Sequence, residues 1–417
     1  MSEESLDPAA PPPPPPPPNG GLKAWLQVLG AHFLFFNSWG LVNTFGVFQN
    51  FYEDSLLTTQ SESNISWIGT FQAFLLVALS LFVGPFFDRG YIHLLIICGS
   101  FLIVFGMMMT SISENYWQVF LSQGLCVGIG TGLNFLPSLA IAATYFTTKR
   151  SLAIGIVASG GSIGSTIYPI VFERLEPRIG FPWTVRVMGF IALATLSISI
   201  ATLRSRLPPP KQARAMLDPA ALKDIPFVLF SVGMFLVFIG LYVPIFYIIS
   251  WAQVHIHIER DLSFYMLSVL NGASVFGRII PGLLADKLGA PLGLMVVNCA
   301  VAGILAFVAI AIHNLGGLVV FAILYGFVSG AVVSLPGTVL ATLAPSLDRV
   351  GTWMGMALCF AALGLLIGNP IAGVIIHVPE DQFRGGFIFS GSFVLAAAAI
   401  FGLVLFLKRD TTKEEKR

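Results

Sequence analysis

The sequence predicts an all-α polytopic membrane protein with twelve transmembrane helices in two six-helix halves. Of its 417 residues, 56% are hydrophobic and only 10% are charged, and the mean hydropathy is +0.84. A chain of this composition has too few polar residues to cover a water-soluble surface. In addition, short charged segments recur about 199 positions apart in the two parts of the chain, which indicates an internal duplication.

The predicted spans follow one another along the chain, separated by segments that contain charged residues, glycine or proline. A helix needs about 20 apolar residues to cross the roughly 30 Å hydrocarbon core of a membrane. Such stretches cover residues 24–49, 66–87, 92–112, 117–146, 152–172, 181–203, 225–251, 262–285, 291–312, 316–341, 352–376 and 387–407. They predict an N-terminal half at 23–204, a cytoplasmic linker at 205–224 and a C-terminal half at 225–407.

The two ends of the chain differ from the spans in composition. Residues 1–22 include eight consecutive prolines, Pro11 to Pro18. This run favours polyproline II, and we expect a disordered tail rather than a docking site for a proline-binding partner. The tail lacks the apolar stretch of a cleavable signal peptide. Residues 408–417 form a second charged tail.

The distribution of basic residues predicts the orientation, because Lys and Arg in short loops stay on the cytoplasmic side. With twelve spans, sixteen basic residues fall on the side of the two termini and four on the other side, while Arg186 and Arg278 lie within spans. The sixteen are Lys23, Arg89, Lys149, Arg150, Arg204, Arg206, Lys211, Arg214, Lys223, Lys287, Arg349, Lys408, Arg409, Lys413, Lys416 and Arg417. The four are Arg174, Arg178, Arg260 and Arg384. We therefore expect a multi-pass protein of the plasma membrane with both termini in the cytoplasm.

The duplicated charged segments lie at predicted cytoplasmic helix ends. A glycine there permits close helix approach, and an aspartate accepts hydrogen bonds from a neighbouring helix. Leu136-Pro137 and Arg150 recur as Leu335-Pro336 and Arg349 in the same register. We predict that the two segments act in gating, through Gly84, Asp88, Arg89, Gly282, Asp286 and Lys287.

Arg278 is the strongest candidate for a binding residue. It lies eight residues before Asp286, or about 12 Å into the membrane along a helix, and such an arginine is costly unless it faces a polar interior. Asn271, Ser274 and Arg278 follow i, i+3, i+7 spacing and share one helix face. That face predicts a cavity in which arginine binds a carboxylate or another oxyanion. The alternative is a structural arginine that caps a neighbouring helix.

Other spans supply further polar candidates for the same cavity. They are Asn37, Asn43, Asn134, Tyr242 and Asn369. Ser159, Ser162 and Thr166 share a face beside glycines and predict helix packing. His32, the only histidine expected inside a span near the first-span asparagines, is interpreted as a packing residue.

Several classes of site are not predicted. The four cysteines lie in apolar stretches, and the alternating histidines at His255 and His257 are interpreted as a solvated loop, so we expect no metal and no cofactor. Asn64 heads a glycosylation sequon too close to the membrane to favour its use. No nucleophile–base spacing or basic nucleic-acid patch is present, so we expect neither an enzyme nor a nucleic-acid partner.

The charged segments resemble the cytoplasmic signature of the major facilitator superfamily, which occurs between spans two and three and between spans eight and nine. Further segments resemble the fungal branch of the monocarboxylate porter family: Gly20-Gly21-Leu-Lys-Ala24-Trp25, Phe-Asn37-Ser-Trp39-Gly40, Thr44-Phe-Gly46-Val-Phe48-Gln49, Lys149-Arg150-Ser-Leu-Ala-Ile-Gly155 and Gly277-Arg278-Ile-Ile-Pro-Gly282. The chain departs from that pattern at Asn19, where the family has an acidic residue. It also departs at Ser274 and near Asn43, where proton-coupled animal members carry Asp and Lys.

The resemblance implies a transporter that works by alternating access, with a small organic acid or secondary metabolite as substrate, in uptake or efflux. The lipid bilayer is the other expected partner. A second hypothesis is proton-coupled monocarboxylate uptake, which the sequence disfavours because no carboxylate lies deep in a span. A third is a non-transporting receptor that uses the proline-rich tail to bind a cytoplasmic partner.

Overall fold

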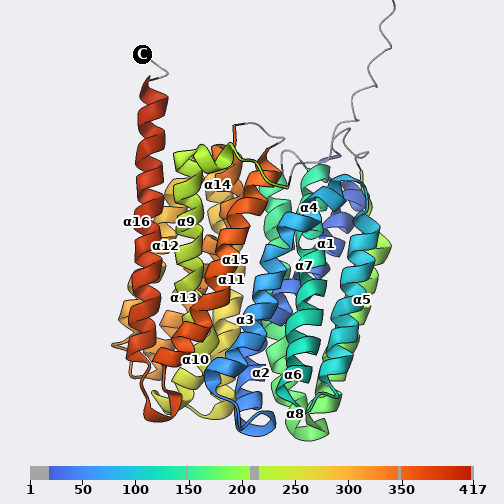
Figure 1. Cartoon of the computed structure of the whole chain (residues 1–417), viewed down its shortest axis with the longest axis vertical. Coiled ribbons are helices and arrows are strands. Elements are labelled where there is room, and N and C mark those ends of the chain that lie inside the picture. Colours follow the sequence, from blue (N-terminus) through green and yellow to red (C-terminus); the bar gives the residue numbers. More distant parts are fainter. Residues whose placement is uncertain (1–17, 147–148, 207–215, 346–348, 415–417) are drawn as a thin grey trace, which may run out of the picture.

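The computed structural model describes residues 18–146, 149–206, 216–345 and 349–414, and within these ranges every regular element is a helix. The predicted proline-rich tail falls mostly outside the described residues. The helices stand side by side as one elongated bundle, in which the C-terminal end of α16 projects from one face (Figure 1). We call the face where α1 begins and α16 ends the terminal face.

The N-terminal half contains the helices up to Thr202. They are α1 (Gly21–Asn43), α2 (Phe45–Phe51), the π-helical turn η1 (Tyr52–Leu56), α3 (Glu62–Ala78), α4 (Ser80–Asp88), α5 (Ile92–Thr110), α6 (Tyr116–Val119), the π-helical η2 (Phe120–Val127), α7 (Gly128–Tyr145) and α8 (Arg150–Thr202). Several are segments of one span: α1 with α2, α3 with α4, and α6 with η2 and α7.

The C-terminal half follows a short 3₁₀ turn, η3 (Ala221–Lys223). Its helices are α9 (Ile225–Gly240), α10 (Val243–Val254), α11 (Arg260–Leu288), α12 (Pro291–Ala309), α13 (Leu315–Ser334), α14 (Pro336–Leu343), α15 (Val350–Ile375) and α16 (Arg384–Glu414), with η4 (Val378–Glu380) between the last two. The helix α16 therefore continues through most of the tail predicted at 408–417.

The helix α8 holds two predicted spans. Its backbone leaves helical geometry at Gly180, where φ is 75°, a value that glycine adopts without strain. Tyr145, at the end of α7, donates a hydrogen bond to the carbonyl of Arg204, just beyond the end of α8. Both ends of α8 thus lie at the terminal face, and the chain turns back at Gly180. The predicted spans 152–172 and 181–203 are the two arms.

Within the described residues, ten helical segments are long and apolar enough to cross a membrane. One of them is Leu152–Thr202, which Gly180 divides into two arms. The segment that begins at Gly21 is not among the ten, although it is helical from Gly21 to Asn43. Most residues of α1 are buried, including Asn37, Ser38 and Asn43. This polar content explains its lower hydropathy, because α1 packs inside the protein rather than against lipid.

Prolines mark two of the helix breaks. Pro244 and Pro336 stand in the first turns of α10 and α14, each just after a break in its span, where the missing N–H costs least. Pro137, Pro281 and Pro370 instead lie inside α7, α11 and α15. Proline does not break the helix at these three positions, because a membrane helix tolerates proline where neighbouring helices support it.

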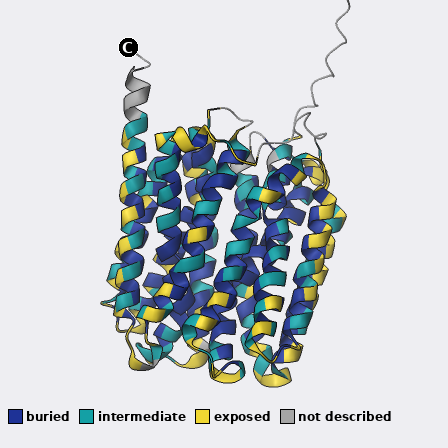
Figure 2. Ribbon diagram, viewed as in Figure 1, coloured by how far each residue is buried: buried dark blue, intermediate teal, exposed yellow. Residues whose placement is uncertain are grey.

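The two halves meet along an interface that we call the seam. It is formed by α8 against α11 and by α15 against α3 and α4. Exposed residues are scattered along the outer helices and lie in the loops at the two ends of the bundle, while buried residues predominate between them (Figure 2). The exposed residues on the helices include large apolar ones such as Phe101, Phe190, Phe276 and Phe406. A surface of this kind suits contact with lipid.

Candidate functional site

A small cavity lies at the centre of the seam and receives side chains from both halves. Asn43 of α1 faces residues of the C-terminal half across it. Its free volume of about 10 Å³ is that of about one water molecule. The protein is therefore closed around this site. The lining residues are Asn43, Tyr242, Ile245, Leu270, Asn271, Ser274, Arg278, Ser329, Gly330 and Val333.

Arg278 brings a positive charge into this cavity. Its exposed fraction is 5%, and Nη1 donates a hydrogen bond of 3.0 Å to the carbonyl of Ala158 on α8. Nε has no hydrogen-bond partner among the described residues. The guanidinium lies 6.0 Å from the centre of the Phe35 ring, at the outer limit of a cation–π contact. No carboxylate in the described part of the chain pairs with it.

The α11 face predicted from i, i+3, i+7 spacing makes three hydrogen bonds with α8. Besides the bond from Arg278, the hydroxyls of Ser274 and Ser162 share a hydrogen bond of 2.7 Å, and Asn271 Nδ2 donates to the carbonyl of Ser165 at 3.3 Å. These contacts join the two halves at the middle of the seam. Any movement that opens the cavity along α8 and α11 has to break them.

Aromatic rings surround the polar centre. Trp39 of α1 stacks on Tyr242 of the C-terminal half, with ring centroids 5.9 Å apart and planes 15° from parallel. Phe135 packs against both Trp39 and Phe35. Trp39 Nε1 is buried without a hydrogen-bond partner in the described residues. The cavity thus combines one cation and an unpaired amide oxygen with the ring of Tyr242, and Trp39 packs against that ring.

Five of the eight predicted binding residues line this cavity, and three do not. The five are Arg278, Asn271, Ser274, Asn43 and Tyr242. Asn37 accepts a hydrogen bond from Tyr168 at 2.6 Å within the N-terminal half, and Asn134 donates to Ser100 at 3.4 Å between α7 and α5. Asn369 is buried in α15, and neither polar atom of its amide has a partner among the described residues.

Sequence reasoning missed the contribution of α13 and of Trp39. Ser329 and Gly330 of α13 line the cavity. A Cβ at Gly330 would lie 2.6 Å from the carbonyl oxygen of Ser274, so the glycine permits close packing of α13 on α11. A serine followed by a glycine inside an otherwise apolar span was the sequence signal that could have indicated the contribution of α13.

The predicted packing role of the glycine-rich part of α8 is confirmed. A Cβ at Gly160 would lie 2.2 Å from the carbonyl oxygen of His32, and one at Gly164 would lie 2.4 Å from that of Phe36. These glycines therefore let α1 and α8 approach closely. His32 Nδ1 lies 2.8 Å from the carbonyl oxygen of Ile156, which agrees with its interpretation as a packing residue.

Polar side chains join the two halves at the face opposite the termini. Arg260 Nε lies 3.6 Å from Glu173 Oε1, Arg174 donates to the hydroxyl of Tyr265, and Ser250 donates to Asn50 Oδ1 at 3.3 Å. Each of these contacts links the N-terminal half to the C-terminal half. They close the seam at this end.

Glu53, which the sequence reasoning did not single out, lies at the same end, four residues beyond the predicted first span. Gln49 Nε2 donates to its Oε1 at 2.9 Å. Burial raises the pKa of Glu53 to about 7; the negative charges of Glu62 and Asp54 add to this rise, and the hydrogen bond from Gln49 opposes it. Burial also raises the pKa of Glu62 above its ordinary value, while His377 opposes the rise.

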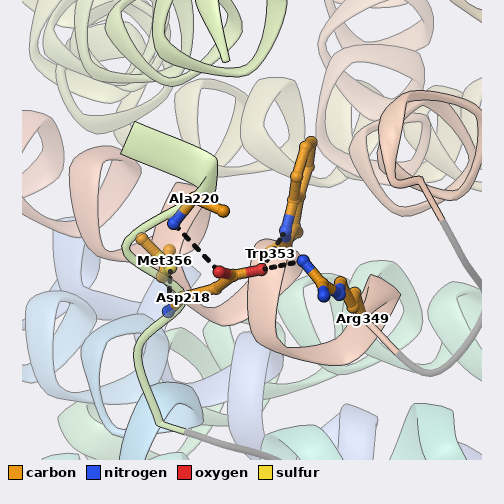
Figure 3. Close-up of polar contacts among 5 residues, drawn as sticks. All are labelled: Asp218, Ala220, Arg349, Trp353 and Met356. Carbon is orange, nitrogen blue, oxygen red and sulfur yellow. Dashed lines mark hydrogen bonds and ion pairs between the residues drawn. The ribbon is translucent and has the colours of Figure 1, made fainter. Parts of the chain in front are cut away.

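At the terminal face, the linker is bound to the C-terminal half through Asp218 (Figure 3). The carboxylate accepts hydrogen bonds from Trp353 Nε1 at 3.1 Å, Arg349 Nη1 at 3.3 Å and the backbone N–H of Ala220 at 3.0 Å. The hydrogen bond from Trp353 is the main cause that lowers the pKa of Asp218, and Ala220 and Arg349 contribute. The carboxylate is therefore ionised at neutral pH.

The start of the linker is bound to the N-terminal half instead. Arg206 Nη1 donates to the carbonyl of Thr144 at 2.8 Å, and Gln27 accepts from the backbone N–H of Arg204 at 2.7 Å. Each end of the linker thus belongs to its own half. Residues 207–215 lie outside the described part of the chain.

The two duplicated segments differ in their geometry. The first ends α4 at Asp88, and Arg89 lies 6.0 Å from the Phe86 ring centre. The second lies within α11, which continues to Leu288. A Cβ at Gly282 would meet no atom within 4 Å. The expectation that Gly282 permits a close helix approach is therefore wrong for this closed state, because no neighbouring atom of the described residues lies near enough. The side chain of Asp286 lies outside the described residues.

Comparison with known proteins agrees with this architecture. A family model described as Major Facilitator Superfamily matches residues 28–312 and 272–417. This chain belongs to the major facilitator superfamily. It is 44% identical over 383 residues to the MFS-type transporter dbaD of Emericella nidulans, a match that covers 92% of this chain and 86% of that protein.

Two further relatives carry names that refer to efflux. The chain is 36% identical over 388 residues to the aspyridones efflux protein apdF of Emericella nidulans. This match covers 93% of this chain and 77% of that protein. It is 37% identical over 389 residues to the agnestins efflux protein AgnL12 of Paecilomyces divaricatus. This match covers 93% of this chain and 88% of that protein. The protein is therefore a multi-pass membrane transporter of the superfamily and not an enzyme.

Proposed function

We propose that this transporter exports a small organic acid or acidic secondary metabolite across the plasma membrane and that Arg278 binds the acidic group. The observation that carries this proposal is the buried Arg278 guanidinium in the central cavity, with a free Nε and no carboxylate partner among the described residues. A buried cation without an anion is costly, and an anionic substrate supplies the missing charge.

The direction rests on two observations. Two relatives are named efflux proteins, for aspyridones and for agnestins. The sixteen-to-four distribution of basic residues favours a cytoplasmic terminal face. Substrate would then enter from the terminal face and leave at the opposite face.

The small cavity supports a mechanism of alternating access, because a space of about 10 Å³ has no room for an organic molecule and the halves must move to admit one. The halves would rock about the cavity, opening one end of the seam at a time. We place the duplicated segments at the terminal end as gating elements. They comprise Gly84, Asp88, Arg89, Gly282, Asp286 and Lys287.

Proton-coupled monocarboxylate uptake, as in the porters that part of this chain resembles, is the second candidate. It uses the same Arg278, but it requires a proton-binding group that cycles with transport. Glu53 is the group that favours it, because its pKa is raised to about 7. Accumulation of an acid inside cells at acidic external pH would support uptake over export.

Comparative metabolite profiling tests the proposal. A deletion strain is complemented with wild type, Arg278→Ala or the control Arg186→Ala, and metabolites are measured inside and outside the cells. Arg186 also lies in a span, but it contacts Ser111 and Trp183 away from the cavity. We expect one acid to accumulate inside the deletion and Arg278→Ala strains, while Arg186→Ala behaves as wild type. An unchanged distribution in the Arg278→Ala strain would contradict the proposal.

A further inference from the structure

We propose that the substrate is a planar aromatic acid that carries a hydroxyl group and that Trp39, Tyr242 and Asn43 select for it. This inference rests on the proposed function and narrows its substrate class. Three buried polar atoms without partners and one pair of stacked rings carry it.

The first two of these atoms are donors on opposite sides of the seam. Arg278 Nε and Trp39 Nε1 are both buried without a hydrogen-bond partner among the described residues. The two side chains flank Gly161: a Cβ built there would lie 3.2 Å from Arg278 Nη1 and 2.8 Å from Trp39 Cβ. A buried N–H left unpaired is unfavourable. A carboxylate has two oxygens and several lone pairs, so it can accept from the guanidinium and the indole together.

The third atom is an acceptor, and its identity follows from the hydrogen bonds around it. Ser165 Oγ donates to the carbonyl of Gly161 at 2.7 Å, so its lone proton is used. Asn43 must therefore present its NH₂ to Ser165 Oγ, at 3.0 Å. This arrangement leaves Asn43 Oδ1 unpaired in the wall of the cavity. A carboxylate cannot satisfy that oxygen, whereas a substrate hydroxyl can.

The ring preference follows from Trp39 and Tyr242. Their rings are nearly parallel, and each comes from a different half of the protein. When the seam opens, the two rings separate and leave two flat faces beside Arg278. An aromatic ring can stack on either face, whereas a saturated ring lacks the matching geometry and quadrupole.

Isothermal titration calorimetry on the full-length protein in lipid nanodiscs tests this inference with three anions. They are benzoate, cyclohexanecarboxylate and 3,5-dihydroxybenzoate, which presents a hydroxyl in either orientation of its ring. We expect benzoate to bind about two- to tenfold tighter than cyclohexanecarboxylate. We also expect 3,5-dihydroxybenzoate to bind about two- to tenfold tighter than benzoate.

The variants should differ in which ratio of affinities for the three anions they change. Trp39→Leu should abolish the preference for benzoate over cyclohexanecarboxylate, and Asn43→Leu should abolish the preference for the dihydroxy acid. Arg278→Gln should weaken binding of all three anions. Asn298→Leu is the control for loss of an amide, because among the described residues Asn298 bonds only within α12. It should leave both ratios unchanged. If Trp39→Leu does not fold, Tyr242→Leu removes the other half of the stack.

The outcomes separate this inference from the function on which it rests. Equal affinity for benzoate and cyclohexanecarboxylate, with both weakened by Arg278→Gln, would overturn the aromatic preference and leave organic-acid transport in place. Preserved ratios in Trp39→Leu and Asn43→Leu would overturn the assigned roles of these residues. Absence of binding for all three anions, together with an unchanged metabolite profile in the deletion strain, would overturn both proposals.

Discussion

The two ends of the seam are closed by different means. At the face opposite the termini, an ion pair and side-chain hydrogen bonds cross from one half to the other, and Glu53 lies beside them with a raised pKa. At the terminal face, the described contacts across the seam include glycines that bring apolar surfaces together. Gly155 approaches Ile279, and Gly355 approaches Leu81. The polar contacts of Asp218 and Arg206 there bind the linker to its own neighbouring half.

This difference indicates that the two ends respond to different conditions. Charge, salt and pH act on the polar end, while shape and volume act on the packed end. In a transporter that opens its ends in turn, a change at one end can therefore favour the state open at that end without acting on the other end. The opening of each end can be measured as a distance between two spin labels, in a variant without native cysteines. Labels at 149 and 223 report the terminal end, and labels at 114 and 311 report the opposite end.

The largest expected effect is that of pH on the opposite end. Glu53 has a pKa of about 7 in the closed state, above its value of about 4.3 in water. Its protonated form therefore stabilises closure fully below the ordinary pKa, and this contribution is lost as pH rises through about 7. Between pH 4 and pH 8 we expect the 114–311 distance distribution to shift toward open by on the order of a hundredfold.

Glu53→Gln should remove most of this pH dependence and hold the opposite end closed. Glu380→Gln, a change in an outer loop where the carboxylate accepts from Gln382, is the matched control and should leave it intact. The 149–223 distance should not change with pH over the same interval. An equal pH response at both pairs would contradict the contrast between the two ends.

The second prediction concerns the packed end. A Cβ at Gly155 would already be in van der Waals contact with Ile279, at 3.4 Å, so we expect the larger side chain of Gly155→Leu to overpack this contact. Overpacking of this kind costs about 1–3 kcal/mol, which favours the terminal-open state by about 5- to 150-fold. The 149–223 distance should lengthen. Gly402→Leu in α16 is the control, because a Cβ there meets nothing within 4 Å.

The smallest expected effect is that of the ion pair between Glu173 and Arg260. The Arg260 side chain is 62% exposed and the distance is 3.6 Å, so a double-mutant cycle with Glu173→Gln and Arg260→Gln should give a coupling of about 0–1 kcal/mol. The coupling, measured from the 114–311 distribution, should fall further in high salt. A coupling well above this range would mean that the ion pair, rather than Glu53, dominates the polar end.

The fold followed from the sequence where one quantity determined it, namely the length of each apolar run. The two arms of α8 were anticipated from 152–172 and 181–203, although they are joined through a single glycine. Helix breaks within a span do not follow from such a single quantity. Pro244 and Pro137 look alike in the sequence, yet only Pro244 follows a break, because the packing of neighbouring helices decides whether a proline is accommodated.

The site was predictable where polar residues share a helix face. Asn271, Ser274 and Arg278 needed only helical periodicity, since the helix has one polar side. Asn37 and Asn43 on α1 are harder to distinguish, because α1 is buried on nearly all sides and gives no hydrophobic face to fix its rotation. Six residues apart, they point to different sides of the helix, about 120° from each other, and only Asn43 reaches the cavity. The partners that satisfy Asn37 come from α8 and are invisible to local spacing.

The stack of Trp39 on Tyr242 also gives the molecule an optical signal of its own. Indole emission depends on what lies against the ring, and this indole touches the other half of the protein only while the seam is closed. With the other six of its seven tryptophans replaced by phenylalanine, Trp39 would be the sole tryptophan emitter. Its fluorescence would then follow each cycle of the unlabelled carrier in real time.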